Sequence, residues 1–468
     1  MRNKKILFGI AAVAGIATAL FLCWWKGAFL PGWIAWQEKE LPYHDGTLLL
    51  KDREASFWMN GKALWSPGKD YFVQDALISD IDRDGEEELI LLTWKHGSYG
   101  SHTPFWVKSR DIALAQHIFI YRYEPGRESR IRAVWMSSDI GYEIGSIGQG
   151  KRSTLLVTPR QGEPSLWHWQ DFGLKYAGPA RTEELTFTAC GDNLIHLPLL
   201  KKGPPFDYLY DHVRPLVQDA DIAALNHETV LVSDNALVSG FPRFGTLMEV
   251  GDAVAGAGFD LVILANNHAL DKGMMGIDGT IGFYEEKGIK VAGAHRSGDA
   301  LAGEDGRNAI TWMEKNGVKL AVLAFTEHTN GIPMSEKEPL AVEKVDEDRM
   351  AEALGHAAGD ADAVIVFMHW GEEYEKEPNE EQRRLARFLC RYGADVVIGS
   401  HPHVIQELEE IKDEETGNRT WVFYSLGNLV SAQEDPECQK SGVACFTVRL
   451  EADGTVSVVD PRLLTILR

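Results

Sequence analysis

The sequence predicts an α/β fold for the carboxyl-terminal part of the chain, preceded by a membrane anchor helix and a smaller all-β domain. Two observations support the α/β prediction. Short apolar runs without charge, typical of strands buried on both faces of a sheet, occur at residues 185–189, 261–264, 363–368 and 396–398. Helical apolar spacing lies between such runs, for example at residues 380–392, and the alternation of strand and helix indicates parallel or mixed layering.

The amino terminus predicts a signal anchor over residues 1–30. Residues 6–25 are an uncharged, mostly apolar stretch of 20 residues, long enough to cross a bilayer as a helix. Basic residues precede the stretch and should stay cytoplasmic, which places the rest of the chain outside the cell membrane. A cleavable signal peptide is the competing interpretation, but no small-x-small site follows, and the bulky Leu22 before Cys23 argues against a lipoprotein.

Residues 41–180 predict a separate all-β domain. The region is rich in aromatic residues and glycine turns, with short alternating segments such as residues 118–123 and 133–136. The stretch 94–106 is either a ligand-binding loop or aromatic packing within this domain.

An acidic loop in this region has the spacing of a calcium loop. Asp80, Asp82 and Asp84 alternate before Gly85, as in loops that wrap calcium. An EF-hand would need Glu at the twelfth position, where Leu91 stands, so the loop instead resembles the Asp-x-Asp-x-Asp-Gly repeats of β-propeller (FG-GAP or VCBS-like) proteins. Only one clear copy exists, which does not favour a full propeller, and a solvated acidic turn is the alternative to calcium binding.

Metal-ligand residue types follow the apolar runs of the carboxyl-terminal region. Ligands collect beyond the carboxyl ends of strands in α/β sheets, so we expect these side chains to converge on one edge. Carboxylate, amide and imidazole donors suit zinc, manganese or iron. A single buried histidine is more often a hydrogen-bonded core residue, so the prediction depends on the joint occurrence. The candidates are Asp192, Glu228, Asn267, His268, His369, His401 and His403.

Other histidines are less informative. His196 faces either the same cleft or the surface, and His227 is ambiguous. His295, His328 and His356 are interpreted as ordinary surface or loop residues.

Six ordered motifs give the region from about residue 184 to the carboxyl terminus a family resemblance. They resemble the motif set of the bacterial capsule-synthesis (CapA-type, poly-γ-glutamate) family, which is similar to the calcineurin-like metallophosphoesterases. The resemblance implies a four-layer sandwich over residues 184–468 with a two-metal site. The motifs are Gly191-Asp192, Asn226-x-Glu228, Ala265-Asn266-Asn267-His268-x-x-Asp271-x-Gly273, His369-Trp370-Gly371-x-Glu373-Tyr374, Gly399-Ser400-His401-Pro402-His403-Val404-x-Gln406 and Tyr424-Ser425-Leu426-Gly427-Asn428.

The resemblance also implies roles for individual residues. His268 would protonate a leaving oxygen, and Asp271 would either orient that imidazole or serve a helix N-terminus. Two divalent cations, manganese, zinc or iron, could clamp the oxygens of a phosphoryl or acyl centre. The implied metal ligands are Asp192, Glu228, Asn267, His369, His401 and His403.

Two positions depart from the family pattern, and they put fine specificity and metal stoichiometry in question. Asn193 to His196 follow the Gly-Asp pair where the family more often has Gly-Arg, and His227 replaces the usual Leu before Glu228. The motif from Tyr424 to Asn428 predicts a strand followed by a tight glycine turn, with Asn428 either near the cleft or stabilising the turn.

The net charge and the cysteine content restrict the partners and the class of protein that the sequence predicts. The formal net charge of −22 makes nucleic acid an unfavourable partner, and an anionic substrate would have to be held locally by metals. Five cysteines are too few for a disulfide scaffold, and Cys438 and Cys445 either pair across a hairpin or remain thiols.

Two functions stay open. The first is a membrane-anchored, extracytoplasmic metal-dependent hydrolase or transferase acting on a phosphorylated substrate or a cell-envelope polymer. The second is a non-catalytic assembly subunit that works with other subunits of a membrane polymer synthase.

Overall fold

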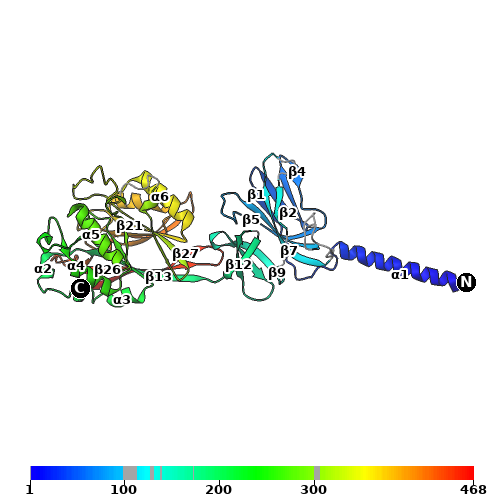
Figure 1. Cartoon of the computed structure of the whole chain (residues 1–468), viewed down its shortest axis with the longest axis horizontal. Helices are drawn as coiled ribbons and strands as arrows, with labels where there is room; N and C mark the ends of the chain where they lie inside the picture. The colour runs from blue at the N-terminus through cyan, green and yellow to red at the C-terminus, as the bar shows by residue number, and fades with distance from the viewer. Residues whose placement is uncertain are drawn as a thin grey trace. The chain divides into compact units, whose positions relative to one another are not determined.

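The computed structural model describes residues 2–97, 113–126, 131–136, 140–171, 173–299 and 306–467, and the chain divides into two compact units (Figure 1). Unit 1 comprises Met1–Arg181 with Glu451–Thr455, and unit 2 comprises Thr182–Leu450 with Val456–Arg468. Most of the loop expected at residues 94–106, including His102 and Trp106, lies outside the described residues.

Unit 1 begins with helix α1 (Arg2–Trp25). At the end of this helix the indole of Trp25 stacks on the imidazole of His96, with ring centroids 4.7 Å apart. Within the described part of the chain, none of the helices is both long enough and apolar enough to span a bilayer. The transmembrane anchor therefore stays a prediction.

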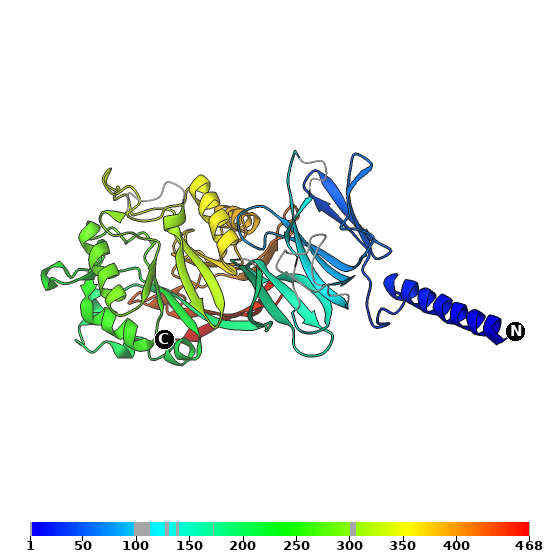
Figure 2. The ribbon, with the colours of Figure 1, turned by 45° about the vertical axis from the view of Figure 1, so that its right-hand side comes forward.

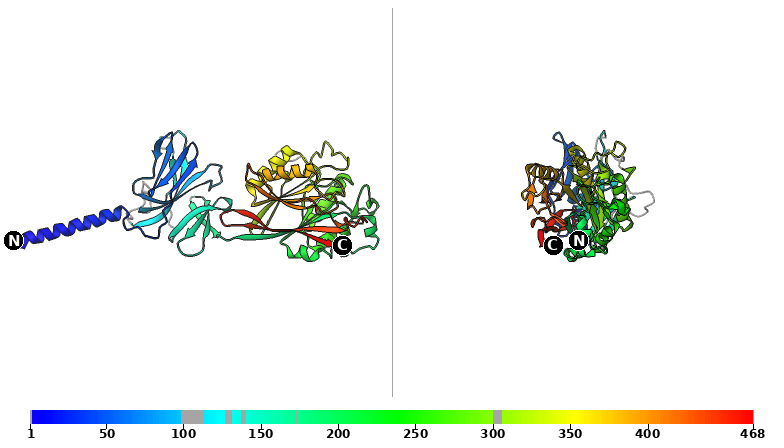
Figure 3. Two further views of the ribbon diagram at one scale, coloured as in Figure 1. Left: turned by 180° about the vertical axis from the view of Figure 1, so that it is seen from behind. Right: turned by 90° about the vertical axis from the view of Figure 1, so that its left-hand side faces the viewer.

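Unit 1 is otherwise built from β-strands, and its described residues form three four-stranded antiparallel sheets, coloured blue to teal in Figure 3. The middle sheet, β5 to β8, is covered on both faces: Leu89 and Leu91 pack with the first sheet, and Ile90 and Leu92 pack with the third. This explains why β6 is apolar without alternation. The strands are β1 (Lys39–Tyr43), β2 (Gly46–Lys51), β3 (Glu54–Met59), β4 (Lys62–Trp65), β5 (Tyr71–Ser79), β6 (Glu88–His96), β7 (Leu114–Tyr123), β8 (Ile131–Trp135), β9 (Ile144–Gly150), β10 (Thr154–Pro159), β11 (Ser165–Gln170) and β12 (Gly173–Pro179).

Unit 2 contains two large mixed sheets in its described residues. One has the order β18-β17-β14-β13-β26-β27, with β25 paired to β13, and the other has the order β19-β20-β21-β22-β24-β23. A short two-stranded sheet joins β15 to β16. The strands are β13 (Glu183–Asn193), β14 (Ile222–Asn226), β15 (Leu231–Val232), β16 (Thr246–Leu247), β17 (Leu261–Ile263), β18 (Lys290–Ala292), β19 (Thr311–Lys315), β20 (Val318–Thr326), β21 (Ala363–His369), β22 (Val396–Ser400), β23 (Leu408–Lys412), β24 (Arg419–Phe423), β25 (Asn428–Val430), β26 (Lys440–Leu450) and β27 (Val456–Leu467).

Helices cover the outer faces of both sheets, so unit 2 has α, β, β and α layers. Alternate residues of β20 and β21 divide between two cores: Leu320 and Ile365 pack against the first sheet, whereas Leu323 and Val366 pack against α6 and α7. Figure 2 shows α6 and α7 in yellow to orange, and α3 to α5 in green. The helices are α2 (Leu197–Leu200), α3 (Arg214–Asp219), α4 (Met248–Ala257), α5 (Gly273–Glu286), α6 (Glu347–Asp360) and α7 (Glu380–Arg391).

The predicted strands and the helix at residues 380–392 are present, and the mixed α/β class is confirmed. Helix α7 starts at a capping box, because the side chain of Asn379 accepts from the amide of Gln382 and the Gln382 side chain accepts from the amide of Asn379. The strand expected at Tyr424 was wrong: β24 ends at Phe423, and Asn428 opens the next strand, β25. No disulfide joins Cys438 to Cys445 in the described structure, and both are thiols.

Candidate metal centre

The candidate ligands lie where neighbouring parallel strands end. Strands β13, β14 and β17 run parallel in the first sheet, and β20, β21 and β22 run parallel in the second. His369 is the last residue of β21 and Asp192 the last but one of β13, and Glu228 and His401 follow β14 and β22 within two residues. Parallel pairing therefore brings residues that are more than 200 positions apart in the sequence into one cluster, as the sequence predicts.

Two glycines of the motifs allow the strands to approach this closely. A Cβ on Gly191 would lie 1.9 Å from the backbone oxygen of Gly427, and a Cβ on Gly399 would lie 1.9 Å from the backbone oxygen of Tyr424. Neither position therefore tolerates a side chain without movement of the backbone.

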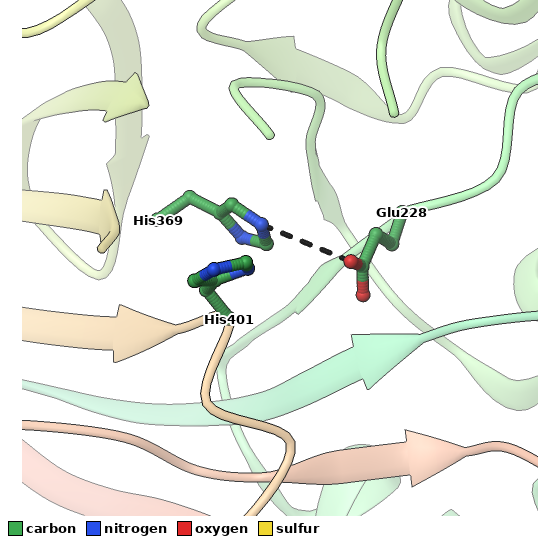
Figure 4. Close-up of side chains that lie close together, drawn as sticks. All are labelled: Glu228, His369 and His401. Carbon is green, nitrogen blue, oxygen red and sulfur yellow. Dashed lines mark ion pairs between the residues drawn. The ribbon is translucent and has the colours of Figure 1, made fainter. Parts of the chain in front are cut away.

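One group of potential ligand atoms comprises Glu228, His369 and His401, whose donor atoms lie within 4.8 Å of one another. The imidazoles of His369 and His401 face the Glu228 carboxylate (Figure 4), and Nε2 of His369 is 3.8 Å from Oε1 of Glu228. All three residues are buried. Neither carboxylate oxygen of Glu228 nor Nδ1 of His401 has a hydrogen-bond partner among the described residues. Orphaned acceptors of this kind fit a bound cation, because unpaired buried polar atoms are costly.

A second group shares Glu228 and adds Asp192 and His403, again within 4.8 Å. Nδ1 of His403 lies 3.0 Å from Oδ2 of Asp192 and 4.0 Å from Oε2 of Glu228. Glu228 thus stands between two groups of three donors, an arrangement that fits two cations with one bridging carboxylate.

Amide and hydroxyl side chains complete and orient these groups. Oδ1 of Asn267 lies 3.0 Å from Nε2 of His369, so both atoms could ligate the same ion. The other ring nitrogen of His369 is 2.9 Å from Oγ of Ser400, which can hold the ring in the orientation that exposes Nε2. Asn226 donates from Nδ2 to Oδ1 of Asp192 over 2.8 Å.

The backbone of the histidine pair is strained. His401 and His403 have φ values of 99° and 60°, in the left-handed region that favours glycine. Such strain costs about 1–3 kcal/mol per residue and is concentrated at functional sites.

Burial and mutual contact set the protonation of these groups. Burial lowers the pKa of His369 well below its usual range, and burial together with His403 lowers the pKa of His401 to about 4. Both imidazoles are therefore neutral at pH 7, which is the form that binds metals. Burial opposes protonation of His403, but the Glu228 and Asp192 carboxylates outweigh it and raise its pKa to about 9. Burial, reinforced by Asp192, raises the pKa of Glu228.

His268 lies at the edge of the cluster with an oriented imidazole. Its Nδ1 is 2.7 Å from Oδ2 of Asp271, and the same carboxylate oxygen accepts from the amide of Phe244 over 2.6 Å. The ring of Phe244 packs edge-on against His268, with centroids 4.8 Å apart. Of the two alternatives for Asp271, this geometry favours orientation of the imidazole. Helix α5 begins two residues later, at Gly273.

The structure adds residues to the cluster that the sequence did not single out. The ring of His328, interpreted above as an ordinary loop residue, has its centroid 5.3 Å from that of His401. Nδ2 of Asn267 donates to Oδ1 of Asn330 over 3.4 Å, and Nδ2 of Asn330 lies 3.4 Å from Nδ1 of His268. Both follow β20, an apolar run that ends in polar residues, and this is the same signal that identified the other strand ends.

The structure also places His196 and His227, whose surroundings the sequence left open. His196 is half-buried, and its ring packs edge-on against Phe244. His227 is fully buried beside Tyr284, and burial lowers its pKa to about 3. His227 is therefore a neutral core residue.

The acidic loop of unit 1 forms a separate group made of Asp80, Asp82 and Glu88. Asp84 is not part of this group. The guanidinium of Arg122 lies 2.6 Å from Asp82, 2.8 Å from Asp84 and 2.5 Å from Glu88. The protein thus already places a cation among these carboxylates, while calcium binding stays a prediction.

The layered α/β unit and its paired ligand groups define a protein with a candidate two-metal centre. The family model described as bacterial capsule synthesis protein PGA_cap matches residues 186–433, more than half of the chain. The chain belongs to this family.

Two curated relatives agree with the family assignment. The PGA biosynthesis protein CapA of Bacillus subtilis (strain 168) is 30% identical over 299 residues, which cover 61% of this chain and 76% of the relative. The capsule biosynthesis protein CapA of Bacillus anthracis is 31% identical over 287 residues, which cover 59% of this chain and 67% of the relative.

Solved structures show only distant similarity. The NAD nucleotidase of Haemophilus influenzae aligns with a TM-score of 0.36 and 13% identity, over 61% of this chain and 51% of that chain. A 5'-nucleotidase from Staphylococcus aureus aligns with a TM-score of 0.38 and 14% identity, over 61% and 55%. The chain spans about half of each, and scores this low add nothing to the assignment.

Proposed function

We propose that unit 2 is a two-metal hydrolase or transferase of calcineurin-like architecture that acts on a phosphorylated or polymeric substrate in capsule or poly-γ-glutamate biosynthesis. The observation that carries the proposal is the pair of buried ligand groups that share Glu228, whose carboxylate oxygens have no hydrogen-bond partner among the described residues. A structural core would not gain from burying such a carboxylate without a partner. The names of the two CapA relatives supply the biosynthetic process.

The residues divide into two ligand sets. Glu228, His369, His401 and Asn267 would hold one cation, and Asp192, His403 and the same Glu228 would hold the other. Bound divalent cations would supply Lewis-acid stabilisation of charge on substrate oxygens. Manganese, zinc and iron all suit this mixture of imidazole and oxygen donors.

His268 would handle the proton of the leaving group. Nδ1 of His268 donates to Asp271 in the neutral tautomer, which leaves Nε2 as the atom that carries a proton to or from the substrate. The role of Asp271 is to fix this tautomer and the ring orientation.

The cellular setting of this activity extends the proposal. If residues 1–30 anchor the chain, unit 2 would lie on the outer side of the membrane, within the cell envelope. A polymer synthase in that membrane would be its partner. The large negative charge argues against nucleic acid.

The test is metal content together with hydrolysis of bis(p-nitrophenyl) phosphate, with manganese or zinc added, for the full chain. We expect bound metal and turnover in the parent, and a loss of about 100-fold or more in His401→Ala, because several kcal/mol of charge stabilisation are removed. His168→Ala, in strand β11 of unit 1, is the matched control and should retain full activity.

The outcomes separate the two functions left open by the sequence. Metal uptake without turnover of this ester or of poly-γ-glutamate would favour the assembly subunit. A parent that neither contains metal nor binds it when added would overturn the metal centre.

A further inference from the structure

We propose that a cavity beside the metal centre receives an apolar group of the substrate and rejects an anionic one. This inference rests on the proposed function, because it assigns the part of the substrate that extends from the reacting phosphate. The cavity has a volume of about 470 Å³, within the range of small-molecule sites. Its wall includes Leu199, Tyr208, Leu209, Val430, Ala432 and Gln433.

One side of the wall is joined to a candidate metal ligand. Oε1 of Gln433 accepts from Nδ2 of Asn428 over 2.7 Å. The same Nδ2 of Asn428 donates to the backbone oxygen of His403 over 3.3 Å. Nε2 of Gln433 donates to the hydroxyl of Tyr374, whose ring centroid lies 6.2 Å from that of His403. Gln433 of the cavity wall is therefore separated from His403 of the second ligand set by one residue on each of two routes.

The same wall is joined to the proton-transfer side of the centre. The amide of Ala432 donates to Nδ1 of His196 over 3.3 Å. The ring of His196 packs edge-on against Phe244 at 5.3 Å, and Phe244 packs against His268 at 4.8 Å. Ala432 and Gln433 are thus linked to the site through His196 and Phe244 on one side and through Asn428 and Tyr374 on the other, which places the cavity next to the residues that surround the site.

Tyr374 gives a further indication that this boundary is functional. Its side chain is half-exposed, and its backbone φ of 71° lies in the left-handed region. A bulky residue is rarely found in that conformation, and the strain places the phenol between His403 and the cavity wall.

The chemistry of the wall selects the occupant. Most of the exposed surface of the wall is apolar, with the polar side chains of His212, Ser431, Gln433 and Gln439 beside it, and its acidic side chains are Asp211 and Glu434. Among the described lining residues there is no lysine or arginine. The nearby cations are already engaged, since Lys202 lies over the ring of Tyr208 at 3.9 Å and Arg214 pairs with Asp211 at 3.4 Å.

A carboxylate in the cavity would thus lose hydration and meet the like charge of Glu434 without a lysine or arginine among the described residues of the wall to pair with, whereas an apolar chain would bury its surface. The substrate class that fits is an amphiphilic phosphoester: the metals take the phosphate, and the cavity takes an apolar substituent. The repeating carboxylates of a polyanion would lie elsewhere.

The experiment compares three p-nitrophenyl phosphodiesters that share the phosphate and the leaving group and carry a methyl, a hexyl or a 5-carboxypentyl group. For the full chain loaded with manganese, we expect KM for the hexyl ester to be about tenfold or more below that of the methyl ester, with similar kcat. The carboxypentyl ester should show no such gain. Ala432→Trp, which fills the cavity, should raise KM of the hexyl ester to the methyl value. Ala358→Trp on the exposed face of α6 is the control and should keep the preference.

Each result has one meaning. Equal KM for methyl and hexyl esters, a preference for the carboxypentyl ester, or a preference that survives Ala432→Trp would overturn the inference while leaving the metal centre intact. If no ester turns over, the proposed function fails, and calorimetric binding of hexylphosphonate against methylphosphonate and 6-phosphonohexanoate decides the inference by the same order of affinities.

Discussion

Replacing the shared carboxylate should separate the stability of the protein from its capacity to bind metal. Glu228 is fully buried, and neither of its oxygens has a hydrogen-bond partner in the described structure. Burial and the Asp192 carboxylate oppose ionisation of Glu228, so folding at pH 7 without metal must either bury the charge or take up a proton, at a cost of about 1–3 kcal/mol. Glu228→Gln removes this cost at nearly constant volume. Since about 1 kcal/mol changes Tm by roughly 2–4 °C in a domain of this size, the metal-free variant should melt about 2–10 °C higher than the metal-free parent.

The response to metal should change in the opposite direction. At a metal concentration of about 100 times Kd, the parent gains about 2.7 kcal/mol, which corresponds to roughly 5–10 °C. Glu228→Gln removes a ligand from both groups and should lose most of this gain. The assay is thermal unfolding followed by circular dichroism, with chelator and with added manganese.

A matched control uses a half-buried carboxyl away from the centre. Asp395 accepts from the amide of Val364 just before β22, so Asp395→Asn makes the same chemical change at the opposite end of the strand. It should leave the metal response unchanged. A Glu228→Gln protein that is less stable than the parent without metal, and still stabilised by manganese, would refute this account of the site.

Three further predictions follow from single contacts. His268→Asn should keep its metal and lose about 10²–10⁴-fold in kcat for esters with a poor leaving group, with a smaller loss for p-nitrophenol; equal losses for both would contradict its role as an acid. Burial raises the pKa of Asp395 to about 6, so the folded state holds this proton more tightly, and the stability that the proton supplies is complete below about pH 4 and lost as pH rises through 6. Asp395→Asn should therefore gain about 1–3 kcal/mol over the parent at pH 7 in urea unfolding and nothing at pH 4. Arg122→Ala should destabilise unit 1 by about 3–5 kcal/mol, because buried Glu88 loses its partner, and Glu88→Gln in the same chain should restore much of the loss.

The strand ends of unit 2 could be predicted because the local signal was strong. The apolar run before His369 and the one before His401 are each long enough to be buried strands, and each ends in a residue type that binds metals. Parallel strands place such ends on one edge, so convergence followed from pattern alone.

Other features of the site depended on long-range packing. His328 follows an apolar run as clear as the others, but its place beside His401 is set only by the parallel pairing of β20 with β21. In unit 1, the spacing of the acidic loop suggested calcium or a solvated turn, and nothing in the loop pointed to Arg122. Arg122 comes from β7, 40 residues away, and reaches the loop only because β6 and β7 pair.

The sequence by itself determined the α/β class, the edge of the sheets where polar residues gather, and the family. Buried strands and residue types that bind metals can both be recognised within short segments of sequence. Only the tertiary structure decided that Glu228 stands between two ligand groups, that Asp271 orients His268, and that residues 430–433 join the centre to a cavity. These depend on distances between side chains on different strands and loops, and such distances are set by the packing of the two sheets rather than by any local pattern.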